Sequence, residues 1–168
     1  MTEYKSTLNI TQTAFPMKAN LPATEPERIR FWDGLGLYRQ LRAKGAGRTK
    51  FILHDGPPFA NGDIHMGTAL NKILKDIIVK HRSLKGFDAP YVPGWDCHGM
   101  PIEHKVVEQM GEAAKTAGKV EIRKKCRNYA LKFVDRQRDE FRRLGVQGDF
   151  EHPYLTLSAE YENSIVDS

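Results

Sequence analysis

The sequence has very little cysteine and no long hydrophobic run. Only Cys97 and Cys126 occur among its 168 residues, which is too few for a disulfide framework or a four-cysteine zinc site. No apolar run approaches the length of a transmembrane helix, and the first thirty residues lack the continuous apolar stretch of a signal peptide. We therefore expect a cytoplasmic protein that does not contact a membrane.

Charge is distributed unevenly along the chain, although the formal net charge of +5 is modest. Residues 119–143 carry ten Lys or Arg and four Asp or Glu, whereas residues 149–168 carry five acidic residues and no Lys or Arg. A basic helix of this kind can face water, or it can bind phosphates, nucleic acid or an acidic partner. A solvated helix face is the simpler interpretation. The length and the 40% hydrophobic content suit one globular domain.

Residues 51–84 change their pattern twice, and each change predicts a different structure. Phe51–Leu53 is a short apolar run that predicts a buried strand. Residues 54–62 contain two prolines, two glycines, an aspartate and an asparagine, so we expect an irregular polar loop. After Met66, apolar residues recur at helical spacing and predict one apolar stripe: Leu70, Ile73, Leu74, Ile77 and Ile78. Strand, loop and helix in this order are typical of the first half of an α/β nucleotide-binding unit.

Further elements are predicted on both sides of this segment. Residues 1–23 are expected to form an extended arm, and residues 24–168 one domain that begins with a helix at Thr24 running to about Lys44. The pattern then predicts a second strand at 89–93, a second polar loop at 94–99, helices at 101–110 and 122–144, a third strand at 154–157 and a final helix capped by Ser158. The last helix reaches Ser168 without a stop signal, so we expect the domain to continue in a longer protein. The predicted fold class is α/β with a parallel sheet, the first half of a Rossmann-like domain.

Both polar loops follow a predicted strand and lead into a helix, so a parallel sheet would bring them to one edge, where ligands bind. In the first loop, the backbone amides near Gly67 begin a helix, which suits a phosphate, and His65 can donate a hydrogen bond to an oxyanion. In the second loop, Asp96 can accept from an ammonium group. Taken alone, Asp96 can equally be a helix cap and His65 a side chain that stabilises a turn. Together the loops predict a site for a phosphate-bearing ligand beside an amine-bearing one.

A metal-dependent phosphohydrolase is the alternative from a different class. Asp63-Ile64-His65 and Asp96-Cys97-His98 are two D-x-H units, and His54-Asp55 adds a third His/Asp pair. The further G-N-H-[DE] unit that we would expect in such an enzyme is missing from the sequence. A non-catalytic binding fragment is the other alternative.

Several motifs, taken in their order along the chain, resemble the class I aminoacyl-tRNA synthetases and, within them, the isoleucine enzymes. They are F-P-M-K-A-N-L-P at 15–22, H-D-G-P-P-F-A-N-G at 54–62, H-M-G-T at 65–68 in place of the family's H-I-G-H signature, P-Y-V-P-G-W-D-C-H-G-M-P-I-E at 90–103, and the segments 143–146 and 153–156. The loops typical of the valine and leucine enzymes do not fit. The resemblance covers nearly the whole chain.

This resemblance implies activation of isoleucine by ATP, with Mg²⁺ carried by the ATP, and transfer to tRNA, which would be bound mainly by regions outside this segment. The residues that it places near ATP are His54, Asn61, His65, Gly67 and Thr68, of which His65 and Thr68 are the catalytic candidates. Gly56, Pro57 and Asp96 would bind the amino acid, with Asp96 on its α-ammonium group. No zinc site is implied within this segment.

Two departures from the family pattern bear on activity. Thr68 stands where the family usually has histidine, which removes a donor near the phosphates but leaves a hydroxyl, so we expect weakened ATP binding. No segment like K-M-S-K-S, which supplies the family's second ATP clamp, occurs in the sequence. We therefore expect this polypeptide alone to lack ligase activity.

Overall fold

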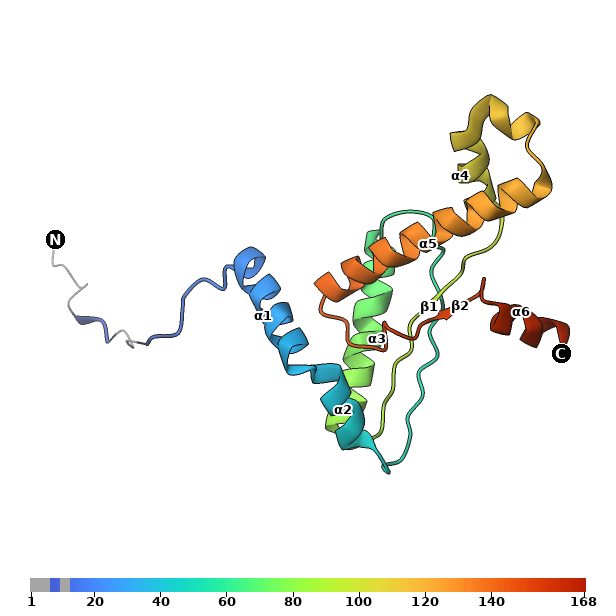
Figure 1. The fold of residues 1–168 in the computed structure, drawn as a ribbon. Helices are drawn as coiled ribbons and strands as arrows, with labels where there is room; N and C mark the ends of the chain where they lie inside the picture. Colours follow the sequence, from blue (N-terminus) through green and yellow to red (C-terminus); the bar gives the residue numbers. More distant parts are fainter. Residues whose placement is uncertain (1–6, 10–12) are drawn as a thin grey trace, which may run out of the picture.

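Helices surround three extended segments in the computed structural model of the chain, which describes residues 7–9 and 13–168 (Figure 1). The α-helices are α1 (Leu21–Leu35), α2 (Leu37–Gly45), α3 (Met66–Leu84), α4 (Met100–Met110), α5 (Lys119–Arg143) and α6 (Ala159–Val166), and η2 (Gly111–Lys115) is a 3-10 helix. The regular strands β1 (Gly94–Trp95) and β2 (Tyr154–Leu155) are short. Within the described ranges, no helix is both long and apolar enough to cross a membrane. Residues 1–6 and 10–12 of the predicted arm lie outside the described residues.

The extended segments run parallel and form a small sheet. β1 pairs with β2 in parallel register, with Gly94 opposite Tyr154. On the other edge of this middle segment, single parallel bridges join Lys50 to Asp88 and Phe59 to Asp96. The order across the sheet is therefore 50–59, 88–96 and 154–155. The prediction of an α/β fold with a parallel sheet is confirmed.

Pairing within the sheet is much sparser than the sequence predicts. Phe51–Leu53 is not a regular strand, and the strand predicted at 89–93 is displaced to Gly94–Trp95. Pro90 and Pro93 contribute to the difference, because proline has no N–H donor. Pro90 lies on the side of Asp88 and Asp96, which bond the first segment, and Pro93 lies on the side that bonds the third segment. The loop predicted at 54–62 continues the first extended segment as far as the bridge at Phe59, and the loop predicted at 94–99 begins with β1 itself.

The helix predicted to begin at Thr24 begins at Leu21. Pro22 lies in its first turn, where the missing N–H has no partner to lose, and the Thr24 hydroxyl donates to the Ala19 carbonyl at 3.1 Å rather than capping the helix. The single helix expected to reach Lys44 is broken at Gly36, whose φ of 59° lies in the left-handed region that glycine adopts readily. Two helices, α1 and α2, therefore meet at a bend (Figure 1).

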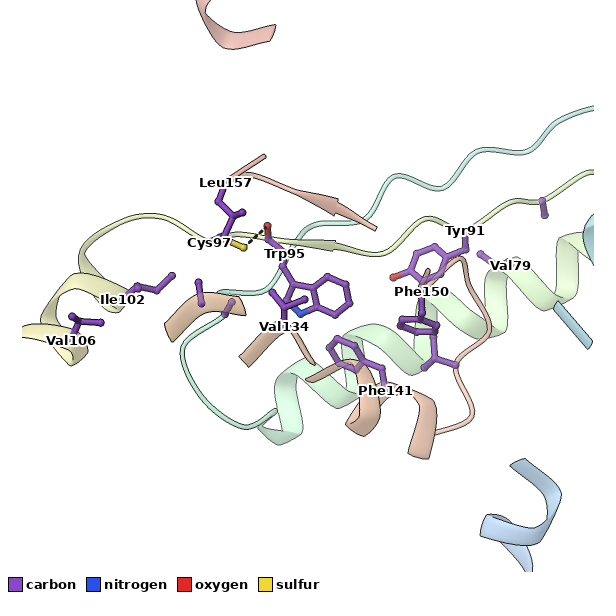
Figure 2. Close-up of a cluster of buried hydrophobic side chains, with 14 residues drawn as sticks. Val79, Tyr91, Trp95, Cys97, Ile102, Val106, Val134, Phe141, Phe150 and Leu157 are labelled. Atoms are coloured by element: carbon purple, nitrogen blue, oxygen red, sulfur yellow. Dashed lines mark hydrogen bonds between the residues drawn. The ribbon is translucent and has the colours of Figure 1, made fainter. Parts of the chain in front are cut away.

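The hydrophobic core joins the middle segment of the sheet to α4 and α5 (Figure 2). Trp95 is fully buried, and its ring centroid lies 6.1 Å from that of Phe141 on α5. Tyr91 and Val134 are buried in the same cluster, and α4 contributes Ile102. The long amphipathic helix predicted before Gly145 is confirmed as α5, which crosses α3 and forms one wall of the core.

The apolar stripe of α3 does not face this core. The residues that α3 buries are Lys72, Asp76 and Val79. All five residues of the predicted stripe are exposed: Leu70, Ile73, Leu74, Ile77 and Ile78. The periodicity identifies the apolar face of the helix, but the rest of this chain packs against the opposite, polar face.

Gly94 is predicted to be the position in the sheet least tolerant of a side chain. A Cβ at Gly94 would lie 2.0 Å from the Tyr154 ring, whereas a Cβ at Gly62 would meet nothing within 4 Å. We expect Gly94→Ala to lower the free energy of unfolding by about 2–3 kcal/mol, as overpacking does, and Gly62→Ala to change it much less. Urea denaturation of both variants checks this; equal losses would contradict it.

Candidate active site

Helix α5 holds the first polar loop in place. The Gln137 side chain donates to the carbonyls of Phe59 at 3.0 Å and Gly62 at 2.7 Å, and accepts from the Trp95 indole at 3.0 Å. Further along α5, the Glu140 carboxylate accepts from the Ile64 backbone amide at 2.9 Å. The loop has no regular secondary structure of its own, so these contacts with α5 and with the middle segment fix its shape.

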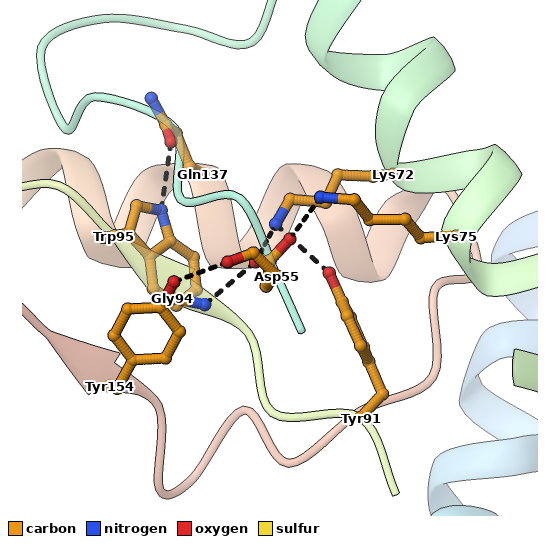
Figure 3. Close-up of polar contacts among 8 residues, drawn as sticks. All are labelled: Asp55, Lys72, Lys75, Tyr91, Gly94, Trp95, Gln137 and Tyr154. Atoms are coloured by element: carbon orange, nitrogen blue, oxygen red, sulfur yellow. Dashed lines mark hydrogen bonds and ion pairs between the residues drawn. The ribbon is translucent and has the colours of Figure 1, made fainter. Parts of the chain in front are cut away.

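Asp55 lies at the centre of a buried polar cluster (Figure 3). Its carboxylate pairs with Lys72 and, at 2.8 Å, with Lys75, and it accepts from the Gly94 backbone amide at 3.0 Å. Asp55 and Lys72 are each only 1% exposed. Lys72 also donates to the Tyr91 hydroxyl at 3.2 Å. The cluster therefore joins the first loop to α3 and to the middle segment of the sheet.

The charges in this cluster stabilise one another. Burial alone would raise the pKa of Asp55, but the charge of Lys72 and hydrogen bonds from Lys72, Lys75 and Gly94 outweigh it and hold that pKa below its usual value. Burial lowers the pKa of Lys72, and Asp55 opposes that effect. Asp55 is thus a carboxylate at neutral pH. Because it directly precedes Gly56, the cluster also fixes the backbone of the loop predicted to bind the amino acid.

Asp96 joins the second polar loop to the first. Its backbone amide donates to the Pro58 carbonyl and its carbonyl accepts from the Ala60 amide, both at 2.9 Å. Its Oδ1 accepts from the His98 amide at 3.1 Å and from the Thr156 hydroxyl at 3.4 Å. The helix-cap role considered for Asp96 is not present, because Gly99 is the N-cap of α4; Asp96 stabilises the turn before that helix instead. Within the described part of the chain, Oδ2 of Asp96 has no hydrogen-bond partner, so it can accept from a ligand.

His54 belongs to an aromatic stack beside the first loop. Its ring centroid lies 5.7 Å from that of Tyr154, with an angle of 13° between the planes, and Tyr154 stacks in turn on Tyr161. The Tyr154 hydroxyl donates to the Asp55 carbonyl at 2.6 Å. Burial raises the pKa of Tyr154 to about 12, so this hydroxyl stays protonated and keeps its donor role. The stack thus positions His54 against a wall of the site.

His65 is the N-cap of α3. Its Nδ1 accepts from the amides of Gly67 at 3.0 Å and Thr68 at 3.2 Å. Because Nδ1 accepts, Nε2 is the ring nitrogen that can donate. A Cβ at Gly67 would lie 3.0 Å from this ring, so the glycine makes room for the cap as well as for any ligand. The turn-stabilising role considered for His65 is confirmed, and its ring occupies the two amides that the sequence assigns to phosphate.

The candidate residues thus fall into two groups. Gly56 and Pro57 lie in the segment that the Phe59–Asp96 bridge ties to Asp96, whereas His65, Gly67 and Thr68 gather at the start of α3. Asn61 lies between the groups, and its carbonyl accepts from the Tyr129 hydroxyl at 3.1 Å. Across the described residues, no hydrogen bond links one group directly to the other.

Sequence reasoning missed the residues that hold the loops. Lys72 and Lys75 lie on the polar side of α3, and Gln137 lies in the helix predicted at 122–144, but the pattern assigns none of the three a contact with a loop. The available signal was the spacing of Lys72, Asp76 and Val79, which share one helix face. The spacing indicates a buried lysine only once Asp55, its partner, is known to be buried.

A cavity of about 470 Å³ lies beside the second loop, between α4 and the start of α5. Cys97 and His98 line it together with Ile102 and Arg127. Burial raises the pKa of Cys97 to about 11, so its thiol stays protonated and is a poor nucleophile. None of the residues predicted to bind ATP or the amino acid lines this cavity.

The geometry does not favour the D-x-H metal site. In residues 7–9 and 13–168, no group of three or more His, Cys, Asp or Glu side chains is placed to hold a metal ion. Asp63 pairs with Arg136 at 2.5 Å, and Asp55 is engaged by its two lysines. The carboxylates of Asp55 and Asp63 thus have other partners, and only Asp96 keeps an oxygen without one in the described residues.

A family model described as class I tRNA synthetases (I, L, M and V) matches residues 27–168. This chain belongs to the class I tRNA synthetases. The isoleucine–tRNA ligases of Brachyspira hyodysenteriae and Methylococcus capsulatus are each 62% identical to it, and that of Thermotoga maritima is 56% identical, over 98% of the chain in each case. The chain spans 18% of the length of each of these relatives.

A solved structure supports the synthetase fold. The crystal structure of a ternary complex of LeuRS from Agrobacterium radiobacter K84 with tRNA and LeuAMS matches this synthetase chain with a TM-score of 0.67. The match covers 89% of this chain and 18% of that one at 16% identity. At this identity the likeness concerns the fold alone, and it agrees with the α/β arrangement described above.

Removing the Asp55 carboxylate should be costly, because it would leave Lys72 buried without a counter-charge. We expect Asp55→Asn to lower the free energy of unfolding by about 3–5 kcal/mol, and Asp63→Asn, whose pair with Arg136 is at the surface, to lower it by less than about 1 kcal/mol. Urea denaturation at pH 7 measures both. A cost for Asp55→Asn no greater than that of the control would contradict the assignment.

The Asp55 contribution also has a predicted pH dependence. Its pKa in the folded protein lies below the unfolded value, so its stabilisation is complete above about pH 4 and is lost as the pH falls through the folded pKa. The stability difference between the native protein and Asp55→Asn should therefore shrink below pH 4. A difference independent of pH down to 2 would show that ionisation of Asp55 is irrelevant.

Proposed function

We propose that this chain forms the N-terminal part of the active site of an isoleucine–tRNA ligase, a cytoplasmic enzyme that activates isoleucine with ATP and transfers it to tRNA. The observation that best supports this proposal is the sequence identity of 54–62% with isoleucine–tRNA ligases over at least 96% of the chain. The two loops at the carboxyl edge of the parallel segments agree with this function.

The amino-acid side of the site consists of Gly56, Pro57 and Asp96. Oδ2 of Asp96 has no partner in the described chain, so we assign it to the α-ammonium group of isoleucine. Gly56 and Pro57 follow Asp55 directly, and the buried lysine pairs of that residue hold their backbone rigid. A rigid loop loses little conformational freedom when the substrate binds.

The ATP side consists of His65, Gly67 and Thr68, with His54 and Asn61 as its outer members. The cap on α3 leaves the Nε2–H of His65 free to donate to a phosphate oxygen. Gly67 keeps the helix start accessible, and Thr68 supplies a hydroxyl. Mg²⁺ would enter with ATP as its counter-ion, and we assign no zinc ligand within this chain.

The chemistry needs no protein nucleophile. The isoleucine carboxylate attacks the α-phosphorus of ATP, its new P–O bond replaces the bond to pyrophosphate, and a ribose hydroxyl of tRNA then takes the aminoacyl group from the adenylate. Holding the carboxylate in line and donating to the phosphoryl oxygens supply the rate enhancement. Asp96 holds the amino acid so that its carboxylate lies in line, and His65 donates to the phosphoryl oxygens. Regions outside this chain would bind most of the tRNA.

Alone, the chain should not catalyse pyrophosphate exchange with isoleucine and ATP, because it has no lysine-rich second clamp for ATP. A chimera in which it replaces the matched residues of the Brachyspira hyodysenteriae enzyme should catalyse the exchange. The same assay on both proteins tests the proposal. Exchange by the isolated chain above a blank without enzyme would refute its inactivity, and an inactive but folded chimera would favour a non-catalytic binding role.

Thr68 should weaken ATP binding relative to histidine. In the same chimera, we expect Thr68→His to lower the KM for ATP about tenfold, since a hydrogen bond to a charged group contributes about 1.5–3 kcal/mol. The KM for isoleucine should not change. Thr68→Val, which removes the hydroxyl, is the matched control and should raise the KM for ATP. An unchanged KM for ATP in Thr68→His would show that position 68 does not act on the phosphates.

A further inference from the structure

Tyr154 and Thr156 lie on one face of the third extended segment. Their backbone amides donate to the carbonyls of Pro93 at 3.1 Å and Trp95 at 3.2 Å, so both residues are in register with the middle segment. Residues two positions apart in an extended chain share a face. The Tyr154 hydroxyl donates to the Asp55 carbonyl, in the first loop, at 2.6 Å (Figure 3). Thr156 makes the corresponding contacts with the second loop.

The Thr156 hydroxyl joins two positions of the second loop. Its oxygen accepts from the Cys97 amide at 2.9 Å, which leaves its own proton to donate. The acceptor that it reaches is Oδ1 of Asp96, at 3.4 Å. Thr156 is only 8% exposed, so the protein rather than water supplies its partners. A hydroxyl can accept from the first group and donate to the second, whereas valine, which has the same shape, can do neither.

The second loop also holds the backbone of Thr156. The His98 Nε2 lies 2.9 Å from the Thr156 carbonyl oxygen. Because a carbonyl oxygen can only accept, Nε2 is the donor. The Glu162 carboxylate of α6 lies 3.4 Å from the same nitrogen. Thr156 is therefore fixed at its hydroxyl and at its carbonyl by neighbouring residues of one loop.

These contacts determine which oxygen of Asp96 is available to a ligand. Oδ1 accepts from the His98 amide at 3.1 Å and from the Thr156 hydroxyl. With two donors on one oxygen, the carboxylate can turn about its Cβ–Cγ bond only by breaking a hydrogen bond. Oδ2, which has no hydrogen-bond partner in the described part of the chain, therefore keeps one direction. An acceptor that is already oriented loses less conformational freedom when it binds an ammonium group.

We propose that Thr156 is a positioning residue for amino-acid binding, whose hydroxyl holds the Asp96 carboxylate in the orientation that binds the α-ammonium group of isoleucine. Thr156 acts through Asp96 and does not contact the substrate. The inference rests on the proposed function, because it requires Asp96 to bind the amino acid. It concerns the amino-acid side alone. Among the described residues, no hydrogen bond joins Thr156 to the start of α3.

The test uses the chimera described above and two inhibitors that each lack one charged group of isoleucine. L-isoleucinol keeps the ammonium group and lacks the carboxylate, whereas 3-methylpentanoate keeps the carboxylate and lacks the ammonium group. Their inhibition constants against isoleucine are measured by pyrophosphate exchange. Thr156→Val should weaken inhibition by isoleucinol about fivefold, as the loss of one hydrogen bond does, and leave inhibition by 3-methylpentanoate unchanged. Thr116→Val, at an exposed threonine, is the matched control and should change neither constant.

Kinetic constants and a conservative variant separate positioning from a purely structural role. In Thr156→Val the KM for isoleucine should rise about fivefold and the KM for ATP should not change. Thr156→Ser keeps the hydroxyl and should restore both the KM for isoleucine and the inhibition by isoleucinol. Native inhibition by isoleucinol in Thr156→Val, or equal losses for the two inhibitors, would overturn the proposal. A folded native chimera without exchange activity would instead overturn the proposed function, and this inference with it.

A second variant covers the case in which Thr156→Val does not fold, since valine leaves the Cys97 amide without its acceptor. Thr156→Cys has a side chain of similar volume that can still accept weakly, but its thiol is a poorer donor than a hydroxyl. It should weaken inhibition by isoleucinol and leave that by 3-methylpentanoate unchanged. Inhibition by isoleucinol as strong in Thr156→Cys as in the native chimera would count against the positioning role.

Discussion

The ion pair between Asp55 and Lys72 connects the parts of the structure from which the site is built. Asp55 belongs to the first loop, Lys72 to α3, and the Gly94 amide that also bonds the carboxylate belongs to the sheet. A charged pair this deeply buried is stable only when its hydrogen bonds are complete. Lys75 and Tyr91 complete them. These contacts fix Asp55, and with it the start of the loop that carries Gly56 and Pro57.

Features with local determinants could be predicted from the sequence. The helix predicted at 122–144 is followed by Gly145 in a left-handed conformation, and Ser158 caps α6 as expected. The strands could not be placed as well, since their pairing depends on residues far apart in the sequence and Pro90 and Pro93 interrupt it. The helix start at Leu21 was missed because threonine is a common N-cap residue, which makes Thr24 the expected start. In the structure, the Thr24 hydroxyl lies inside the helix and donates to the carbonyls of Ala19 and Asn20 instead of capping it.

The site shows the same division between local and distant information. The loops and their candidate residues follow from glycine, proline and histidine spacing, and the Phe59–Asp96 bridge confirms that they adjoin. The contacts of Gln137 with the first loop could not be predicted, because they join residues more than seventy positions apart. In α3, periodicity gives an apolar face but carries no information about what covers it. Lys72 is buried there only because Asp55 is its partner.

The His65 cap makes the start of α3 a site that already contains its own ligand. Any anion that approaches the amides of Gly67 and Thr68 competes with the imidazole that bonds them. An anion that bonded these amides directly would have to displace the ring, whereas one that accepts from Nε2 of His65 would leave the cap in place. The amides at the start of α3 are therefore satisfied within the chain itself.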